Sequence, residues 1–419
     1  MHEKKINIKF YLLPTLIIFS FLVRLVSAYF FRDTEFDNEW STLIDNLINY
    51  KTYAFYTFNS VLIPSVYMPP LYPFFVFAVN AITSVEKQNL LYIIIFLQII
   101  LSVYSIYLFY EINKNFFSQN ISLVNSTILS IIPLNIYASG QISSITLQMF
   151  FSFLFLKFLL VLIKDQSIKN IVIFSITSGL LVLTRGEFVL IFFSLVFFIY
   201  INKKISLTNL IKIFIITFLV LSPYLIRNYT HFNQIILVKS LGYNLWKGNN
   251  PFSTVGGFEL GVENSIEIKQ NFRKTEFQNL KLKITNLKEN KYYEINRDDV
   301  FLSEAIENLS KYPKRYLILF FKKFYSYFFI DMNSNYPNYY NFFHIFPIII
   351  ISLFSIPGLF IFYKKNRFEN QCFGMYLFLN LIIFSIFFIL PRYKLIILPV
   401  QIILIAYFFI YMFQRFKKN

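Results

Sequence analysis

Three carboxylates, Asp37, Glu39 and Asp45, follow the first hydrophobic stretch of the chain. A carboxylate at a membrane boundary is costly to desolvate, so acids there, in a chain that is 56% hydrophobic, indicate chemistry such as proton abstraction. If residues 37–49 form a helix, Asp37, Ser41 and Asp45 share one face at i, i+4 and i+8. The apolar residues between them fall on the other face, which predicts a helix lying on a bilayer surface. A solvated loop with ordinary surface acids is the alternative.

Basic residues later in the chain offer the complementary chemistry. Arg392 and Lys394 lie in a short turn between the last two hydrophobic stretches, and Arg227 follows an earlier one. Charge-assisted hydrogen bonds from such side chains hold phosphate groups. Arg227 could equally be a snorkelling anchor at the membrane surface. Arg185 and Glu187 flank another tight turn and are predicted to pair with each other.

The elements that must position these side chains are transmembrane helices. The chain has 419 residues, of which 15% are charged, against about 25% in soluble domains. Several apolar stretches of roughly 18 or more residues predict an all-α, polytopic integral membrane protein. The net charge of +17 indicates loop topology and contact with membrane lipid, not nucleic-acid binding. One cysteine, Cys372, excludes an internal disulfide framework and a cysteine zinc site.

The hydrophobic pattern predicts a bundle of roughly ten membrane spans. The first follows several lysines, but it ends without a small-residue cleavage site, so we expect it to be retained. The predicted spans are 10–31, 89–110, 121–139, 142–163, 171–184, 188–200, 210–225, 343–362, 376–390 and 395–413. Two further apolar segments, 74–85 and 316–330, are predicted to lie at the membrane interface.

Lysine and arginine placement in the short loops predicts the topology. If segment 74–85 does not cross, every strong basic cluster in a short loop falls on the side of the N-terminus, Lys203 and Lys204 included. The positive-inside rule makes this side cytoplasmic. We therefore expect a multi-pass protein of the cytoplasmic membrane, with both termini inside and the first-loop carboxylates outside. Arg392 and Lys394 then lie outside against this bias, which favours phosphate binding.

The predicted spans divide the chain into three parts. Residues 1–225 form an N-terminal transmembrane module, whose acidic first outer loop covers 32–88. Residues 226–313 form the large extracytoplasmic segment, which mixes acids and bases and contains glycine turns. Residues 314–419 form a C-terminal transmembrane module.

A series of short motifs runs through nearly the whole chain. The first-loop acids are followed by Pro69-Pro70-Leu71-Tyr72-Pro73. The later motifs are Thr184-Arg185-Gly186, Ser222-Pro223-Tyr224, Ile226-Arg227-Asn228-Tyr229, Asn244-Leu245-Trp246-Lys247-Gly248-Asn249-Asn250-Pro251, Tyr312-Pro313 and Pro391-Arg392-Tyr393-Lys394. In this order, the motifs resemble those of the GT-C membrane glycosyltransferases. Within that superfamily they are most similar to the bacterial protein O-mannosyltransferase and lipid A aminoarabinose transferase group, glycosyltransferase family 39.

The resemblance implies a GT-C fold and an enzyme that moves a sugar from a polyprenyl-phosphate carrier to an acceptor on the outer membrane face. The acceptor would be a surface glycan, a lipid or a protein. In that family the acid matching Asp37 activates the acceptor or holds a divalent metal ion, and Glu39 stands close enough to support either task. No other cofactor is expected. The resemblance also assigns Tyr72, Lys247 and Asn249 to contacts with donor or acceptor.

The sequence departs from the family pattern at two points. Tyr67 and Met68 stand where many relatives have an acid and a lysine, and segment 139–148 has no acid. Because these residues are missing, we expect Asp37 and Glu39 to carry more of the catalytic role.

No glycine-rich nucleotide-binding loop is visible, which fits the polyprenyl-phosphate sugar that the resemblance implies as the donor. Arg227, Arg392 and Lys394 are predicted to bind its phosphate, since developing charge on that leaving group needs cations.

Two other functions stay open at this point. An O-antigen polymerase or ligase typically relies on arginines in late outer loops, whereas here an early acidic loop stands out. A transporter or flippase for lipid-linked sugars would be favoured by internal repeats, and none is visible. The identity of the sugar and of the acceptor, and the oligomeric state, do not follow from the sequence.

Overall fold

A computed structural model describes residues 8–36, 38–259, 271–334 and 341–417. These residues are mostly α-helical, as the hydrophobic pattern predicts, so the all-α membrane fold class is confirmed. Their one sheet is an antiparallel hairpin of β1 (Ala54–Phe58) and β2 (Val61–Pro64).

Six helices in the described part of the chain are long and apolar enough to cross a membrane, and each coincides with a predicted span. They are α1 (Ile8–Phe31), α4 (Lys87–Asn113), α7 (Ile145–Lys164), α10 (Leu207–Phe232), α15 (Phe342–Lys364) and α17 (Lys394–Phe416), the last continuing from the short turn η1 (Pro391–Tyr393).

Helices also occupy the remaining predicted spans, but they are shorter or more polar. They are α5 (Gln119–Ile131), α6 (Pro133–Ala138), α8 (Ile168–Thr184), α9 (Phe188–Ile201) and α16 (Phe368–Ile386). The two segments predicted to lie at the interface form α3 (Leu71–Thr83) and α14 (Pro313–Phe328).

A proline breaks the predicted span 121–139 into two helices. The backbone of Ile132 is extended, with φ −63° and ψ 117°, because the ring of Pro133 disfavours a helical conformation in the preceding residue. The uninterrupted helix expected there is therefore wrong.

Another proline does not end its helix. The span predicted to end at residue 225 continues through Pro223 to Phe232, and Asn233 then closes α10 in the left-handed region, with φ 52°. The sequence suggested that Arg227 lies in a loop after the span. The structure instead places it inside α10.

The centre of the bundle is α17, in which every residue of Lys394–Tyr407 is buried. It packs against α15, α5, α16 and α7. Apolar residues on all sides of a helix are typical of a span surrounded by other spans.

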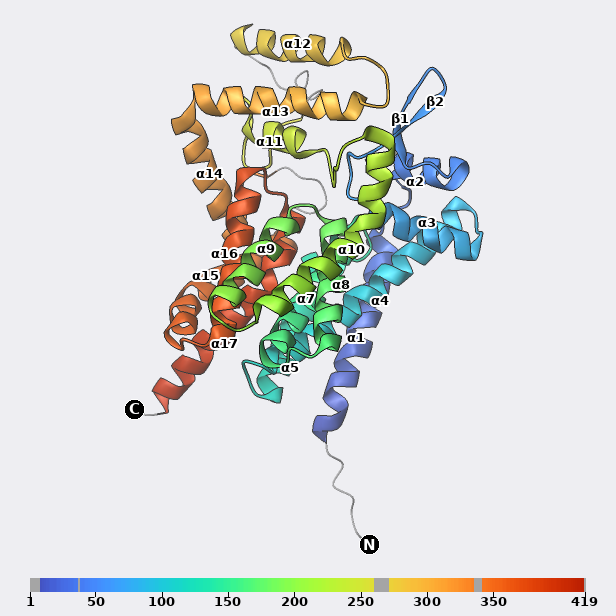
Figure 1. The fold of residues 1–419 in the computed structure, drawn as a ribbon. Helices are drawn as coiled ribbons and strands as arrows, with labels where there is room; N and C mark the ends of the chain where they lie inside the picture. The colour runs from blue at the N-terminus through green and yellow to red at the C-terminus, as the bar shows by residue number, and fades with distance from the viewer. Residues whose placement is uncertain (1–7, 37, 260–270, 335–340, 418–419) are drawn as a thin grey trace.

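One end of the bundle carries the helices that do not span. The start of α1 and the end of α17 lie at the opposite end from α2 (Asn38–Tyr50), the hairpin and the helices of the large outer segment (Figure 1). Those helices are α11 (Leu241–Asn249), α12 (Asn271–Thr285) and α13 (Tyr293–Lys311), and α14 descends from them toward α16 (Figure 1).

Several predicted basic turns lie together in the structure. Lys164 Nζ donates to Asn115 Oδ1 at 2.6 Å, and Gln166 Nε2 donates to the carbonyl of Lys204 at 2.6 Å. The three turns that follow α4, α7 and α9 are therefore neighbours, as the positive-inside argument requires.

Candidate active site

A cavity of about 430 Å³ lies at the end of the bundle that carries α11. Its size is within the usual range for a small-molecule site. It is lined by Trp40, Tyr67, Met68, Pro69, Ser143, Ser144, Ile145, Arg185, Gly186, Glu187, Leu190, Leu237, Val238, Ser240, Leu241, Tyr243, Asn244, Lys247, Glu259, Ile383, Phe387, Phe388, Leu390, Arg392 and Tyr393.

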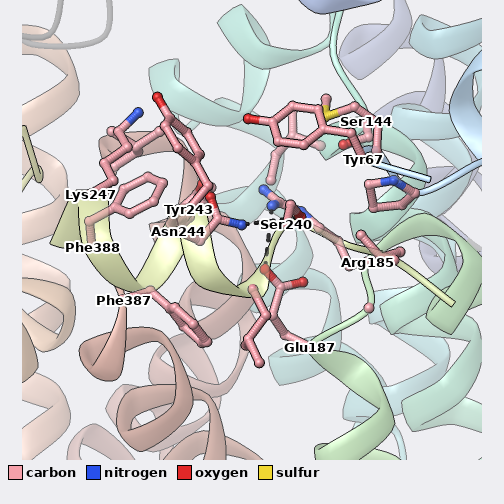
Figure 2. A pocket seen from close by; sticks show the side chains of 18 of the residues that line it. Tyr67, Ser144, Arg185, Glu187, Ser240, Tyr243, Asn244, Lys247, Phe387 and Phe388 are labelled. Atoms are coloured by element: carbon pink, nitrogen blue, oxygen red, sulfur yellow. Dashed lines mark hydrogen bonds and ion pairs between the residues drawn. The ribbon is translucent and has the colours of Figure 1, made fainter. Parts of the chain in front are cut away.

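The walls come from connections that are far apart in the sequence. Lys247 and Phe388 lie at one side of the cavity, and Tyr67 and Ser144 lie at the other (Figure 2). Lys247 lies on α11 and Phe388 in the segment after α16. Tyr67 lies in the loop before α3, and Ser144 lies at the start of α7.

An arginine is held in the cavity wall by three separate elements. Arg185 Nε donates to Gln148 Oε1 at 3.1 Å, and its guanidinium lies 4.8 Å from the ring centroid of Tyr393. Glu187, across the tight turn between α8 and α9, is 3.9 Å from the nearest guanidinium nitrogen (Figure 2). The predicted pair is therefore present but loose, and the orientation of Arg185 depends more on α7 and on the ring.

Lysine provides a second cation on the opposite wall. Lys247 Nζ lies 4.5 Å from the ring centroid of Phe388 and forms an ion pair with Glu259. Arg392 is the third cation that lines the cavity. With Glu187 and Glu259 as the two acids, the lining has a net positive charge, which suits an anionic ligand.

Helix α11 presents Lys247 to the cavity because its two ends are fixed. The carboxylate of Asp298 on α13 accepts hydrogen bonds from the backbone nitrogens of Gly242, at 3.1 Å, and Tyr243, at 2.8 Å. Burial raises the pKa of Asp298, although both backbone donors favour its charged form.

The other end of α11 packs directly on the segment after α16. A side chain at Gly248 would put its Cβ 1.9 Å from the carbonyl oxygen of Phe387, so only glycine allows this approach. Asn249 Nδ2 donates to the carbonyl of Ile386 at 2.8 Å, and buried Lys323 on α14 donates to the carbonyl of Gly248 at 2.8 Å.

Comparisons with known proteins agree with this architecture. Residues 68–226 match the sequence profile of the dolichyl-phosphate-mannose-protein mannosyltransferase family. No curated protein sequence matches the chain significantly. The oligosaccharyltransferase of Archaeoglobus fulgidus, tethered to an acceptor peptide, superimposes with a TM-score of 0.58 at 15% identity, covering 97% of this chain and 50% of that one.

Two further structures of that archaeal enzyme are similar. The AglB complex with an inhibitory peptide and a dolichol-phosphate has a TM-score of 0.55 at 15% identity, over 98% of this chain and 51% of AglB. The complex with Zn and sulfate has a TM-score of 0.56 at 14% identity, over 96% and 49%. The fold is that of the GT-C membrane glycosyltransferases. The chain spans about half the length of these solved structures.

Within this GT-C fold, only one of the three predicted acids, Asp45, has a side chain that the structure describes. Asp37 is outside the described residues, and Glu39 begins α2 with a side chain that is likewise not described. The neighbouring Trp40 lines the cavity, so the start of α2 borders it. Asp45, on the same helix, is paired with Lys87 at 2.7 Å. A helix is present where residues 37–49 predict one, as α2 from Asn38 onward.

Two of the predicted binding residues, Arg392 and Lys247, line the cavity. The other four make contacts inside the protein. Arg227 donates to the carbonyls of Ser65, at 2.6 Å, and Tyr53, at 3.0 Å. The ammonium of Lys394 contacts the carbonyls of Tyr327 and Phe328 and lies 3.0 Å from Ser352 Oγ.

Tyr72 and Asn249 are buried as well. The hydroxyl of Tyr72 donates to Gln98 Oε1 at 3.0 Å, and its ring packs edge-on against Trp40 at 4.9 Å. Asn249 lies on the side of α11 that faces α16, as its bond to Ile386 requires. Neither residue lines the cavity.

Sequence reasoning overlooked Tyr243, Ser143 and the environment of Arg185. Ser143 lines the cavity, and its hydroxyl oxygen is buried and has no hydrogen-bond partner among the residues that the structure describes. The sequence signal was the polar stretch 139–148, which stood out only for its lack of acids.

A metal site is not formed by the side chains that the structure describes, since these hold no group of three His, Cys, Asp or Glu residues. Asp37 and Glu39, on which the sequence prediction relied, are outside that test.

Proposed function

We propose that this chain transfers a sugar from a polyprenyl-phosphate carrier to an acceptor on the outer face of the cytoplasmic membrane. The observation that carries this proposal is the cavity itself. It gathers Arg185, Lys247 and Arg392 beside the start of α2, where the sequence places Asp37 and Glu39. Cations and carboxylates at one cavity are what transfer from a phosphate leaving group requires.

The cations would act on the donor. As the bond between the sugar and the phosphate oxygen breaks, negative charge develops on the phosphate. Arg185 is fixed by Gln148 and Tyr393, so its donors need little reorganisation to meet that charge. Arg392 adds a second guanidinium from the turn before α17, and Lys247 adds an ammonium from α11.

The acids would act on the acceptor. A hydroxyl is a poor nucleophile until a positioned carboxylate removes its proton, and we assign that task to Asp37. Glu39 orients Asp37 or, with it, holds a divalent metal ion that would polarise the same groups. Asp45 is not suited to the role, because Lys87 already neutralises it.

The orientation of the bundle supports a lipid-linked donor. The basic turns at Lys164 and Lys204 lie together, and the positive-inside rule places them in the cytoplasm. The cavity lies toward the other end, with α11, where cytoplasmic nucleotide sugars do not occur. The family matched at 68–226 is named for a dolichyl-phosphate sugar, and one similar AglB structure contains a dolichol-phosphate.

The test uses the purified full-length protein in lipid nanodiscs. Deleting the chain and finding which sugar disappears from the surface glycan identifies the sugar to supply. We expect release of polyprenyl phosphate and glycosylation of the acceptor when the corresponding polyprenyl-phosphate sugar is supplied together with acceptor from membranes of the deletion strain. We expect no turnover when the matching nucleotide sugar replaces the lipid-linked donor. Steady turnover with the nucleotide sugar in the absence of lipid carrier would overturn both the orientation and the donor.

A further inference from the structure

A second cavity lies against α14, apart from the candidate active site. Its volume is about 670 Å³. The residues that line it are Ser253, Thr254, Val255, Lys314, Arg315, Ile318, Leu319, Lys322, Asp331 and Asn333. It shares none of its lining with the first cavity.

The charge of this cavity is positive. Lys314 and Lys322 are exposed, and Arg315 is fixed by a hydrogen bond of 2.5 Å to the carbonyl of Pro251. Asp331 is the one acid in the lining, so the cations outnumber it by three to one. Burial raises the pKa of Asp331.

The same helix carries an apolar stripe beside these cations. Leu317, Phe321 and Tyr325 recur every four residues along α14, and all three are about 60% exposed. Lys314 and Lys322 follow the same spacing on the neighbouring stripe. Tyr316, Leu319 and Tyr327 on the remaining face are buried and hold the helix against the protein.

Beside the apolar stripe, α14 also contacts α16, one of the helices in the predicted spans. Phe324 on α14 packs edge-on against Phe378 on α16, with ring centroids 6.0 Å apart, and Phe378 is itself exposed. A cationic pocket that adjoins a lipid-facing apolar surface at the end of a bundle matches a phospholipid, with its headgroup phosphate in the pocket and its chains along the helices.

We propose that the α14 cavity binds the phosphate of an anionic phospholipid. The lysines and Arg315 hold the phosphate, and the exposed residue Thr254 lies in the same lining, where its hydroxyl can meet the phosphate or the glycerol. The bound lipid would brace the loop 250–259, whose other side contributes Glu259 to the active-site cavity. The inference stands independently of the proposed sugar transfer, since it needs no reaction.

The test is lipid binding by native mass spectrometry. Delipidated full-length protein in a neutral detergent is titrated with phosphatidylglycerol and, separately, with zwitterionic phosphatidylcholine. We expect phosphatidylglycerol to bind at least about tenfold more tightly. Each lysine near an anionic lipid contributes about a fivefold change in affinity, so Lys314→Gln with Lys322→Gln should remove most of the preference.

Matched controls separate a site from general surface charge. Lys288→Gln with Lys291→Gln removes the same two charges from the exposed turn before α13 and should leave the preference unchanged. An equal loss in this control pair, or equal binding of both lipids by the wild type, would overturn the proposal. So would tighter binding of polyprenyl phosphate than of phosphatidylglycerol that depends on Lys314 and Lys322, because the cavity would then belong to the carrier. A thermal melt of each variant confirms that it is folded.

Discussion

The carboxylate of Glu294 on α13 accepts a hydrogen bond of 2.7 Å from the backbone nitrogen of Val66, which lies 228 residues earlier in the chain. The same oxygen accepts a bond of 3.0 Å from the hydroxyl of Ser65. Tyr67, the next residue, lines the candidate active site. Glu294 thus fastens the large outer segment to the loop that forms one wall of the cavity.

This contact should depend on pH. Burial raises the pKa of Glu294 to about 7, whereas the unfolded value is 4.5. The folded state therefore binds the proton more tightly than the unfolded state does, so stability is greatest at low pH and falls as the pH rises through this range. The difference of about 2.5 pKa units corresponds to about 3 kcal/mol as an upper bound. We expect the melting temperature of the purified protein to decrease as the pH is raised from 5 to 8. Glu294→Gln should flatten that slope, and an unchanged slope would contradict the assignment.

The proposed base can be tested against a matched acid, Asp45, which lies eight residues later on α2. Asp37→Asn keeps the shape of the side chain but cannot accept a proton, so the rate of transfer should fall by about 10²- to 10⁴-fold. Asp45→Asn loses only an exposed ion pair with Lys87, worth about 0.2–1 kcal/mol, and should retain transfer. Glu39→Gln should have an intermediate effect. Near-normal transfer by Asp37→Asn, with protein level and folding checked, would exclude its role as the base.

Arg392 and Lys394 are separated by one residue but should behave differently. Arg392→Ala removes a cation from the cavity lining and is expected to raise KM for the donor more than KM for the acceptor. Lys394→Ala leaves the carbonyl of Tyr327 and the hydroxyl of Ser352 without their donor. A buried acceptor left unsatisfied costs about 1–3 kcal/mol, so this variant should melt earlier while its folded fraction keeps the normal KM. Opposite results would exchange the two roles.

Substitution of two glycines tests whether α11 packs closely against the segment after α16. Gly248→Ala would place a methyl group against the carbonyl of Phe387, displace Lys247 and cost about 1–3 kcal/mol. A methyl group at Gly256 would lie 3.9 Å from its nearest heavy atom, the carbonyl oxygen of Ile389, so Gly256→Ala should be tolerated. Melting temperature and transfer rate, measured for both variants, check the comparison. Equal tolerance would mean that α11 is not held as described.

The orientation can be examined by cysteine labelling in a Cys372→Ala background. Lys288 is exposed in the outer turn between α12 and α13, and Lys204 is exposed in the turn after α9. We expect Lys288→Cys to react with an impermeant maleimide in intact cells, and Lys204→Cys to react only after permeabilisation. Asn249 on α11 is only 4% exposed and is therefore unsuitable for labelling. The reverse pattern would invert the proposed topology.

The helices were predictable because each hydrophobic run has to satisfy its own backbone within a bilayer. The residues at which the helices end were less predictable. Pro133 breaks a helix and Pro223 does not, and the type of residue is the same in both cases. A proline in the sequence therefore does not by itself fix where a helix of this chain ends.

The sequence predicted the types of residue at the cavity, but not which of their side chains line it. Arg392 and Lys394 are both basic and nearly adjacent, yet only Arg392 lines the cavity. The partners of Lys394 come from α14 and α15, more than 40 residues away. For Arg185, the nearby Glu187 suggested a simple ion pair. In the structure, Gln148 and Tyr393, from distant segments of the chain, orient its guanidinium. Long-range contacts of this kind decide which side chains meet a substrate.

The spread of the cavity walls along the chain has a consequence for biosynthesis. One wall includes Trp40, and another includes Tyr393 in the turn before the central helix α17. A nascent chain whose last hairpin is still inside the ribosome has no complete cavity, and it lacks the core that α17 provides. The candidate active site therefore cannot form while the protein is still being inserted, and a chain that ended before residue 391 would lack part of its wall.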